Sequence, residues 1–236
     1  MRVKLIANGS CPWERWTRRW GLSFVINDNI LFDAFGDARV LMGNLHRFKV
    51  DIGKIEKVVV SHEHWDHVDG LKPFLTEKSG VGVYIPVKAD AGVKTKIRLW
   101  GGSVIDVAGP VKIKEEVHLS GEIIGKYDGK NIPEQALVLE TSKGLVVIAG
   151  CAHPGIADMV CRIKKDFGKN VSGVIGGFHL KERLLEDIGM EAARLKTAGV
   201  QMAVPLHCTG SKASKIFQQV FGPGCLLLQE GQEISF

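Results

Sequence analysis

Three histidines and two acidic residues stand within the seven positions Ser61-His62-Glu63-His64-Trp65-Asp66-His67. Side chains alternate along extended backbone, so His62 and His64 point to the same side. Imidazole nitrogen and carboxylate oxygen are ligands for zinc, iron and manganese. The segment therefore predicts a metal site, and Asp66 with His67 can address a second metal position beside it. The alternative interpretation is a polar loop that is rich in histidine without binding metal.

The elements that must position these residues are β-strands. The apolar run within Lys57–Ser61 predicts a buried strand directly before the histidine segment. Three further histidines also come after predicted strands: His153 after Leu145–Ala149, His179 after Val171–Ile175 and His207 after Gln201–Val204. Because a rigid sheet positions the loops at its strand ends, this placement indicates a functional site. The two remaining histidines, His46 and His118, are interpreted as surface or structural residues.

The spacing His-x-His-x-Asp-His resembles the signature of the metallo-β-lactamase superfamily, and the resemblance extends over nearly the whole chain. Four other segments carry it: Leu31-Phe32-Asp33, Gly150–Ile156, Gly176–Leu180 and Pro205–Gly210. The last three, with Gly21-Leu22-Ser23, are most similar to one subgroup. That subgroup is named for 7,8-dihydropterin-6-methyl-4-(β-D-ribofuranosyl)aminobenzene 5′-phosphate synthase, an enzyme of the methanopterin pathway.

The resemblance implies two sets of metal ligands. The first set is His62, His64 and His153, and the second set is Asp66, His67 and His207. The implied cofactor is zinc, as one or two ions, with iron or manganese as alternatives. Asp33 is expected to orient a ligand imidazole through the second ring nitrogen. The alternative for His153 and His207 is a hydrogen-bonded loop histidine without a metal.

The chain departs from the superfamily pattern at Cys151, where many members carry an aspartate that bridges two metals. The intermediate histidine expected near residues 129–135 is also absent. Cys151 is interpreted as a soft metal ligand, a redox-sensitive neighbour or a packed thiol. His179 is predicted to be catalytic together with Asp66. It has three candidate roles, as a metal ligand, a proton donor to a leaving group or a phosphate-binding residue, against the alternative of a turn histidine.

Composition limits the class of protein. Of the 236 residues, 45% are apolar and the formal net charge is +5. This mild excess of positive charge suits a small anionic substrate, and it falls short of what a dedicated nucleic-acid-binding protein carries. The five cysteines include no Cys-x-x-Cys pair, which argues against a disulfide framework and favours the cytoplasm. No apolar run is long enough for a membrane span, and a homo-oligomer is compatible with the sequence.

The order of predicted elements indicates one α/β domain over residues 1–236. Strands dominate the first half, after which strands alternate with helices over Gly155–Phe167, Lys181–Thr197 and Ser211–Phe221. In the second of these helices, Leu184 and Leu185 are expected to face inward. Two short strands, Cys225–Leu228 and Glu233–Phe236, are predicted at the end. This order suits two packed sheets with helices outside, which is also the four-layer αββα sandwich that the resemblance implies.

The segment Cys11–Trp20 combines tryptophans at positions 13, 16 and 20 with three arginines. Spacing of three and four residues puts the three indole rings on one helical face, which predicts an amphipathic turn docked on the core. A second interpretation is an aromatic and basic lid over the metal site, with arginine holding a phosphate or carboxylate.

Four functions are compatible with the sequence. The first is a metal-dependent hydrolase in which a metal-activated hydroxide attacks an ester or phosphoester. The second is a transferase similar to the dihydropterin-type synthase. The third is a non-catalytic metal-binding module, and the fourth is a nuclease, for which the chain lacks the expected additional nucleic-acid domain.

Overall fold

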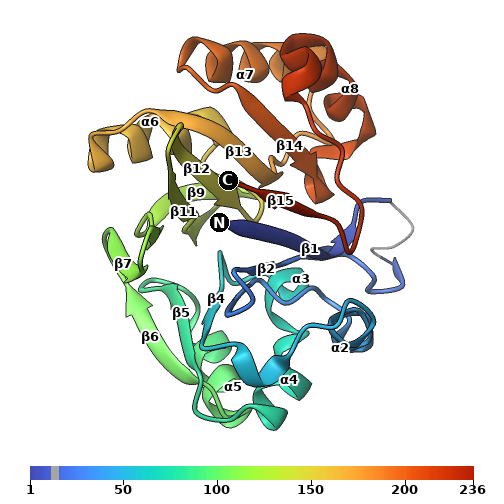
Figure 1. Ribbon diagram of the computed structural model, residues 1–236, viewed down its shortest axis with the longest axis vertical. Coiled ribbons are helices and arrows are strands. Elements are labelled where there is room, and N and C mark those ends of the chain that lie inside the picture. The colour runs from blue at the N-terminus through green and yellow to red at the C-terminus, as the bar shows by residue number, and fades with distance from the viewer. Residues whose placement is uncertain (12–15) are drawn as a thin grey trace. The chain divides into compact units, whose positions relative to one another are not determined.

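A computed structural model describes residues 1–11 and 16–236 of the chain (Figure 1). The chain divides into two compact units. Unit 1 comprises Met1–Ala108 and Gln229–Phe236, and unit 2 comprises Gly109–Leu228. Each unit is built around its own sheet, and the prediction of a single domain over 1–236 stays a prediction.

Unit 1 contains a seven-stranded mixed sheet in the order β15-β1-β2-β3-β4-β5-β6. The strands are β1 (Arg2–Gly9), β2 (Gly21–Ile26), β3 (Ile30–Phe32), β4 (Lys57–Val59), β5 (Gly82–Pro86), β6 (Ser103–Val107) and β15 (Glu233–Ser235). Pairing is antiparallel from β15 to β3 and parallel from β3 to β6. The almost continuous apolar runs of β2 and β3 are fully buried, as expected of strands covered on both faces.

The helices of unit 1 pack on this sheet through apolar stripes. They are α2 (Ala38–Arg47), α3 (Trp65–Val68), α4 (Leu71–Glu77) and α5 (Ala91–Leu99). Leu45 of α2, Phe74 of α4 and Ile97 of α5 belong to one buried cluster with the strand residues Val58 and Val83. Aspartates cap α2 and α5, each accepting a backbone N–H of the first turn, which is why these helices begin where they do.

The two ends of the chain meet in unit 1. Strand β15 pairs antiparallel with β1, with Ile234 opposite Val3. The amino group of Met1 donates a hydrogen bond to the carbonyl oxygen of Phe236 at 2.6 Å. The last eight residues of the sequence therefore complete a sheet whose other strands lie within the first 108 residues.

Unit 2 contains a six-stranded mixed sheet in the order β14-β13-β12-β11-β8-β7. The strands are β7 (Val111–Lys114), β8 (Val117–Leu119), β11 (Leu137–Thr141), β12 (Gly144–Ala149), β13 (Val171–Gly177) and β14 (Met202–Leu206). Strands β12, β13 and β14 are mutually parallel, so their carboxyl ends lie at one edge of the sheet. A separate hairpin consists of β9 (Ile123–Tyr127) and β10 (Lys130–Glu134).

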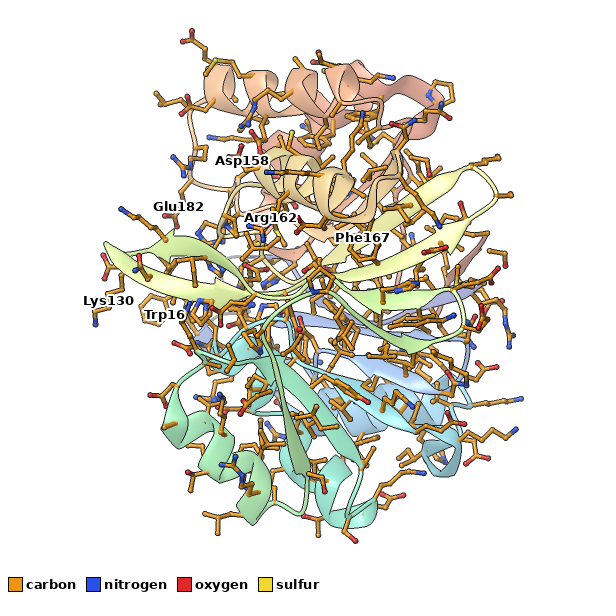
Figure 2. The ribbon with its side chains drawn as sticks, turned by 90° about the vertical axis from the view of Figure 1, so that its left-hand side faces the viewer. Trp16, Lys130, Asp158, Arg162, Phe167 and Glu182 are labelled. Carbon is orange, nitrogen blue, oxygen red and sulfur yellow. The ribbon has the colours of Figure 1, made fainter. Side chains whose placement is uncertain are left out.

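Three amphipathic helices cover the unit 2 sheet: α6 (Ile156–Phe167), α7 (Leu185–Thr197) and α8 (Gly210–Phe221). Met159 and Ile163 of α6 pack inward, whereas Asp158 and Arg162 lie on its exposed face (Figure 2). None of the helices in the described ranges 1–11 and 16–236 is both long and apolar enough to cross a membrane.

Two sequence predictions about unit 2 are wrong. The segment Cys225–Leu228 is no strand, because it follows the 3-10 turn at Gly222–Gly224 and touches β14 only through one bridge, between Cys225 and Ala203. Helix α7 begins at Leu185, four residues later than predicted. Leu184 and Leu185 are consequently 73% and 62% exposed rather than turned inward.

Candidate metal centre

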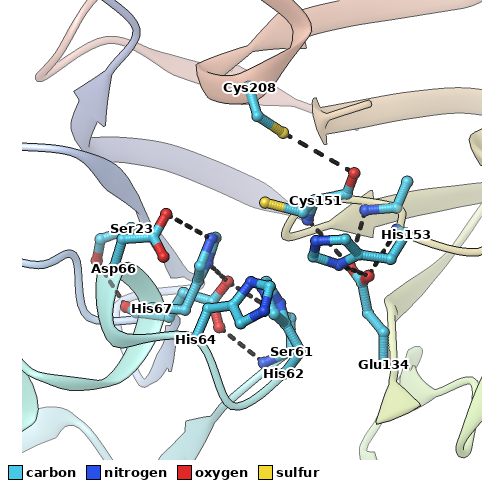
Figure 3. Close-up of polar contacts among 12 residues, drawn as sticks. Ser23, Ser61, His62, His64, Asp66, His67, Glu134, Cys151, His153 and Cys208 are labelled. Carbon is cyan, nitrogen blue, oxygen red and sulfur yellow. Dashed lines mark hydrogen bonds and ion pairs between the residues drawn. The ribbon is translucent and has the colours of Figure 1, made fainter. Parts of the chain in front are cut away.

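In unit 1, the predicted histidine segment runs from the end of β4 into α3 and forms a tight cluster (Figure 3). Nε2 of His62 lies 3.1 Å from Nδ1 of His64. The ring of His67 lies 4.2 Å from that of His62, measured between centroids, and its Nε2 lies 3.4 Å from Oδ2 of Asp66. The four predicted residues of this segment are thus brought together.

The buried carboxylate of Asp33 forms hydrogen bonds with this cluster. Oδ2 of Asp33 lies 2.6 Å from Nδ1 of His67 and accepts the hydroxyl hydrogen of Ser61 at 2.7 Å. Oδ1 of Asp33 accepts the backbone N–H of Ser61 at 2.7 Å. Burial raises the pKa of Asp33 above its ordinary value, although these donors oppose that effect. Asp33 was expected to contact a histidine of the site, and this contact is present.

The hydrogen-bond directions fix the histidine tautomers. The Ser61 hydroxyl gives its hydrogen to Asp33, so at 2.8 Å it accepts from Nδ1–H of His62. Nδ1–H of His67 likewise donates to Asp33. In both rings Nε2 is therefore the nitrogen that a metal would contact, in place of any proton held there.

The charges of the unit 1 cluster also suit a cation. His67 lies between the carboxylates of Asp33 and Asp66. Burial alone would lower the pKa of His67, but the two carboxylates outweigh it and hold this pKa well above its ordinary value. Lone pairs and negative oxygens that converge in a buried place require a positive charge, as a proton or as a metal ion. The residues therefore fit the implied metal.

The Gly21-Leu22-Ser23 segment supports the same cluster. Ser23 donates its hydroxyl hydrogen to the carbonyl oxygen of Asp33 at 2.8 Å. Gly21 has a φ of +128°, and a Cβ placed there would lie 2.0 Å from the carbonyl oxygen of Asp66. No side chain fits at this position without moving Asp66.

We therefore expect Gly21→Ala to lower the free energy of unfolding by about 2 kcal/mol or more, because a backbone clash adds to a disfavoured φ. Urea denaturation followed by circular dichroism measures this change. Gly43→Ala is the matched control, since nothing lies within 4 Å of its Cβ and it is inside α2. Alanine there is expected to stabilise by about 0.5–1 kcal/mol. Equal stability of the two variants would contradict the steric argument.

In unit 2, the candidate residues gather where the parallel strands β12, β13 and β14 end. Ligand atoms of Cys151, His153 and His179 lie within 4.8 Å of one another. Those of Cys151, His207 and Cys208 are equally close. The parallel register thus brings together three sequence segments that are predicted to be functional.

Glu134 is the residue of this site that the sequence did not reveal. Its Oε1 accepts the backbone N–H groups of Cys151 and Ala152, and its Oε2 accepts that of His153, all at 2.8–2.9 Å. Oε2 also lies 2.9 Å from Nδ1 of His153, as Figure 3 shows. Burial alone would raise the pKa of Glu134, but its bonds with His153 and the backbone N–H groups lower it to about 2.

Glu134 fixes His153 in the same way that Asp33 fixes His67. With Nδ1–H donated to the carboxylate, Nε2 of His153 carries the lone pair. The only sequence signal was position: Glu134 lies in the stretch 129–135, where a histidine was expected.

The backbone of the unit 2 loops is held in an uncommon conformation. Ala152, His179 and His207 have φ values of +53°, +51° and +49°. Such left-handed residues other than glycine are uncommon and cluster at functional sites. At Gly176 a Cβ would lie 2.0 Å from the carbonyl oxygen of Ala149, so close packing of β13 against β12 requires glycine.

His179 follows β13 and belongs to the clustered residues of unit 2. Its Nδ1 is buried, and no residue in the described part of the chain hydrogen-bonds to it. The ring of Tyr127, from the β9–β10 hairpin, meets the rings of His179 and His153 edge-on at 5.5 Å. Burial alone would lower the pKa of His179, but the neighbouring Cys208 raises it.

Cys208 is a buried thiol with an altered acidity. Its Sγ accepts the backbone N–H of His179 at 3.3 Å and lies 3.9 Å from the carbonyl oxygen of Cys151. Burial alone would raise the pKa of this thiol. The contact with Cys151 and the nearby His207 and His179 hold the pKa well below its ordinary value instead.

The tryptophan segment is only partly described, and Trp13 lies outside the described residues. Trp20 is buried, whereas Trp16 is 90% exposed, so these two rings do not share a docked face. Arg18 pairs with Asp69 at 2.5 Å and its guanidinium lies 4.7 Å from the centre of the Trp65 ring. The interpretation of this segment as a lid stays a hypothesis.

The predicted ligands are divided between the units. His62, His64, Asp66 and His67 belong to unit 1, and His153, His179 and His207 belong to unit 2. Within each unit the residues lie close together, while the two implied ligand sets, which draw on both units, stay predictions.

Comparison with known proteins supports the resemblance. A family model described as a beta-lactamase superfamily domain matches residues 28–122. The 7,8-dihydropterin-6-methyl-4-(beta-D-ribofuranosyl)-aminobenzene-5'-phosphate synthase of Methanocaldococcus jannaschii is 29% identical, over 92% of this chain and 90% of the relative. An uncharacterised protein of the same organism is 28% identical, over 89% and 91%.

Solved structures agree on the fold. Tm1679, described as a metal-dependent hydrolase of the beta-lactamase superfamily, has a TM-score of 0.80 at 24% identity and covers 100% of this chain and 99% of its own. The short form of human tRNase Z has a TM-score of 0.67 at 16% identity, with coverage of 100% and 99%. The predicted fold class and the predicted resemblance to this superfamily are confirmed.

Proposed function

We propose that this chain, whose fold is that of the metallo-β-lactamase superfamily, is a metal-dependent hydrolase of small anionic esters or phosphoesters. One observation carries the proposal. In each unit a buried carboxylate accepts Nδ1–H of a site histidine, Asp33 from His67 and Glu134 from His153. Metal-binding histidines characteristically have such a partner, which sets the tautomer and raises the basicity of the ligand nitrogen.

The proposed metal-binding residues are those predicted from the sequence: His62, His64, Asp66, His67, His153 and His207. When bound, a divalent zinc, iron or manganese ion would polarise the ester and lower the pKa of water toward about 7. The fixed tautomers mean that the side chains need little reorganisation to bind it.

Two residues are proposed to move protons. Asp66 is 6% exposed and presents Oδ2 beside the ligand nitrogen of His67, so this oxygen can accept a proton from the attacking water. Nδ1 of His179 is proposed to give a proton to the leaving oxygen. It is suited to this role because no described residue hydrogen-bonds to it. The ring of Tyr127 packs edge-on against the His179 ring.

A second candidate is the transferase reaction suggested by the name of the 29% identical relative, a dihydropterin-type synthase. The hydrolase proposal takes its support from the fold neighbour described as a metal-dependent hydrolase. Incubation with a pterin-methyl diphosphate and an aryl ribose phosphate separates the two. A coupled product would favour the transferase, and release of simple hydrolysis products would favour the hydrolase.

The experiment that tests metal dependence is elemental analysis of wild type, His153→Ala and His207→Ala, combined with hydrolysis assays on a panel of phosphoesters and carboxylic esters. Wild type is expected to hold one or two transition-metal ions per chain. Each variant is expected to lose part of this metal and at least 100-fold in hydrolysis, because a ligand nitrogen is removed.

His118→Ala is the matched control, since His118 bonds to Glu140 at 3.1 Å and packs on Phe167 outside the site. It should keep full metal content. Full metal in His153→Ala and His207→Ala would reject both ligand assignments, and Cys151 and His179 would be the next residues to test. A wild type that binds metal without hydrolysing any ester would favour the non-catalytic module.

The remaining proposals concern the cellular location of the protein and the charge of its substrate. The proposed location is the reducing cytoplasm, which the odd number of cysteines and the lack of a Cys-x-x-Cys pair favour. The proposed substrate is a small anion, consistent with the net charge of +5.

A further inference from the structure

Two buried thiols lie together in unit 2, a feature that the proposed reaction does not use. Ligand atoms of Cys151, Cys208 and His207 lie within 4.8 Å of one another, and all three residues are buried. Cys151 follows β12, whereas His207 and Cys208 form the 3-10 turn after β14. Both strands pair with β13 in parallel, so the sheet itself sets the separation of the two sulfurs.

Glycine at position 177, at the end of β13, leaves space beside these sulfurs. A Cβ at Gly177 would lie 2.7 Å from Sγ of Cys208 and 2.3 Å from the carbonyl oxygen of Gly150. The absence of a side chain at Gly177 therefore keeps open the space into which Cys208 points. Cys208 also has little choice of direction, because its Sγ accepts the backbone N–H of His179 at 3.3 Å.

The donor set has a definite chemical preference. Two sulfurs and one imidazole nitrogen are the ligands of zinc, iron and other soft or borderline ions, whereas magnesium and calcium take oxygen ligands. Packing of an apolar core does not by itself account for two cysteines beside a histidine at the same edge of the sheet. Cys151 is 56 positions from His207 and 57 positions from Cys208 in the sequence. That the fold brings these three donors together indicates a common ligand.

We propose that Cys151 and Cys208 are thiolate ligands of the metal ion that His207 binds, so that this ion is held by sulfur and is zinc-like or iron-like rather than magnesium- or manganese-like. The inference rests on the proposed metal dependence and specifies the class of metal. The Cys151 thiolate thereby takes a ligand role at the position where many relatives have an aspartate.

Spectroscopy of the cobalt-loaded protein tests this inference without an activity assay. The protein is stripped of metal with a chelator under reducing conditions and then titrated with Co²⁺. Thiolate ligation is expected to give an intense near-ultraviolet charge-transfer absorption that grows in proportion to the bound cobalt. Cys151→Ser and Cys208→Ser are each expected to lose about half of this absorption, since each removes one of two sulfur ligands.

Cys161→Ser is the matched control, because Cys161 is an exposed thiol on α6 of the same unit. It should keep the full absorption. The wild-type spectrum decides the question even if a variant fails to fold. Cobalt that binds without charge-transfer absorption would overturn the thiolate inference and leave the proposed metal site intact. A wild type that binds no cobalt would instead overturn the proposed metal dependence itself.

Discussion

Replacing Glu134 by alanine is expected to lower the free energy of unfolding by about 4 kcal/mol or more and to abolish metal retention. The carboxylate accepts three backbone N–H groups and the Nδ1–H of His153, and both side chains are buried. Each buried donor that loses its partner costs about 1–3 kcal/mol. In the alanine variant four such donors would have no acceptor. The loop 151–153 would therefore lose its conformation, and His153 would lose its position as a metal ligand.

Glu134→Gln separates charge from shape. The amide has nearly the same volume, but its NH₂ group is a donor and must face backbone N–H groups on one side. We expect it to be destabilised by about half as much as the alanine variant and still to bind metal weakly. The measurement is urea denaturation of the metal-free proteins, with elemental analysis of the loaded ones.

Glu140→Ala is the control for this series. Glu140 is a partly exposed glutamate on β11, the next strand along the sequence, and its side chain pairs with Lys169 at 2.6 Å and His118 at 3.1 Å. Exposed ion pairs contribute about 0–1 kcal/mol, so its loss should be small. If Glu134→Ala were as stable as Glu140→Ala, the carboxylate would not organise the loop.

Asp33→Asn is expected to reduce the affinity for zinc about 10–100-fold, the usual consequence of removing the partner of a ligand histidine. One oxygen of Asp33 becomes an NH₂ group that cannot accept hydrogen bonds from Ser61 or His67. The side chain is fully buried, so the variant is also expected to lose about 2–4 kcal/mol of stability. Competition with a chromogenic chelator measures the affinity.

The control is Asp37→Asn, also in unit 1. Asp37 caps α2 by accepting the N–H of Arg39, and asparagine caps helices as well as aspartate does. Its affinity for zinc should equal that of wild type. An Asp33→Asn variant that binds zinc as tightly as this control would show that the fixed tautomer of His67 does not contribute to binding.

Much of the fold was predictable because its longer elements have clear periodicity. The strand predicted at Leu145–Ala149 differs from β12 by one residue at its start, and the helices predicted at Gly155–Phe167 and Ser211–Phe221 differ from α6 and α8 by the same amount. Helix α4 was not predicted, because its seven residues include Pro73 and show less than two turns of pattern.

The turn of the β9–β10 hairpin has a recognisable sequence. Asp128-Gly129, both with positive φ, is a preferred two-residue hairpin turn. Gly125 and Pro133 obscured it, since both residues argue against a strand. Gly125 is required there, because a Cβ at this position would lie 2.5 Å from the backbone of His153.

The histidines of the site were predictable because residue type and spacing indicate metal binding. Of the two carboxylates that contact them, only one was predictable. Asp33 was expected, since it belongs to a segment that resembles the superfamily. Glu134 was not, because its partners are 17–19 positions away and meet it only through the tertiary fold. No local pattern distinguishes such a glutamate from one at the end of an exposed strand.

The pairing of β15 with β1 has a consequence for how the chain is made. Because residues 233–235 pair with residues 2–4, the edge of β1 stays bare on the ribosome until residue 235 has been made. All of unit 2 is translated before that edge is covered. Closing a loop of this length is a slow, non-local step, and a bare strand edge invites association with other chains. Removal of residues 229–236 should therefore reduce soluble yield far more than their small number suggests.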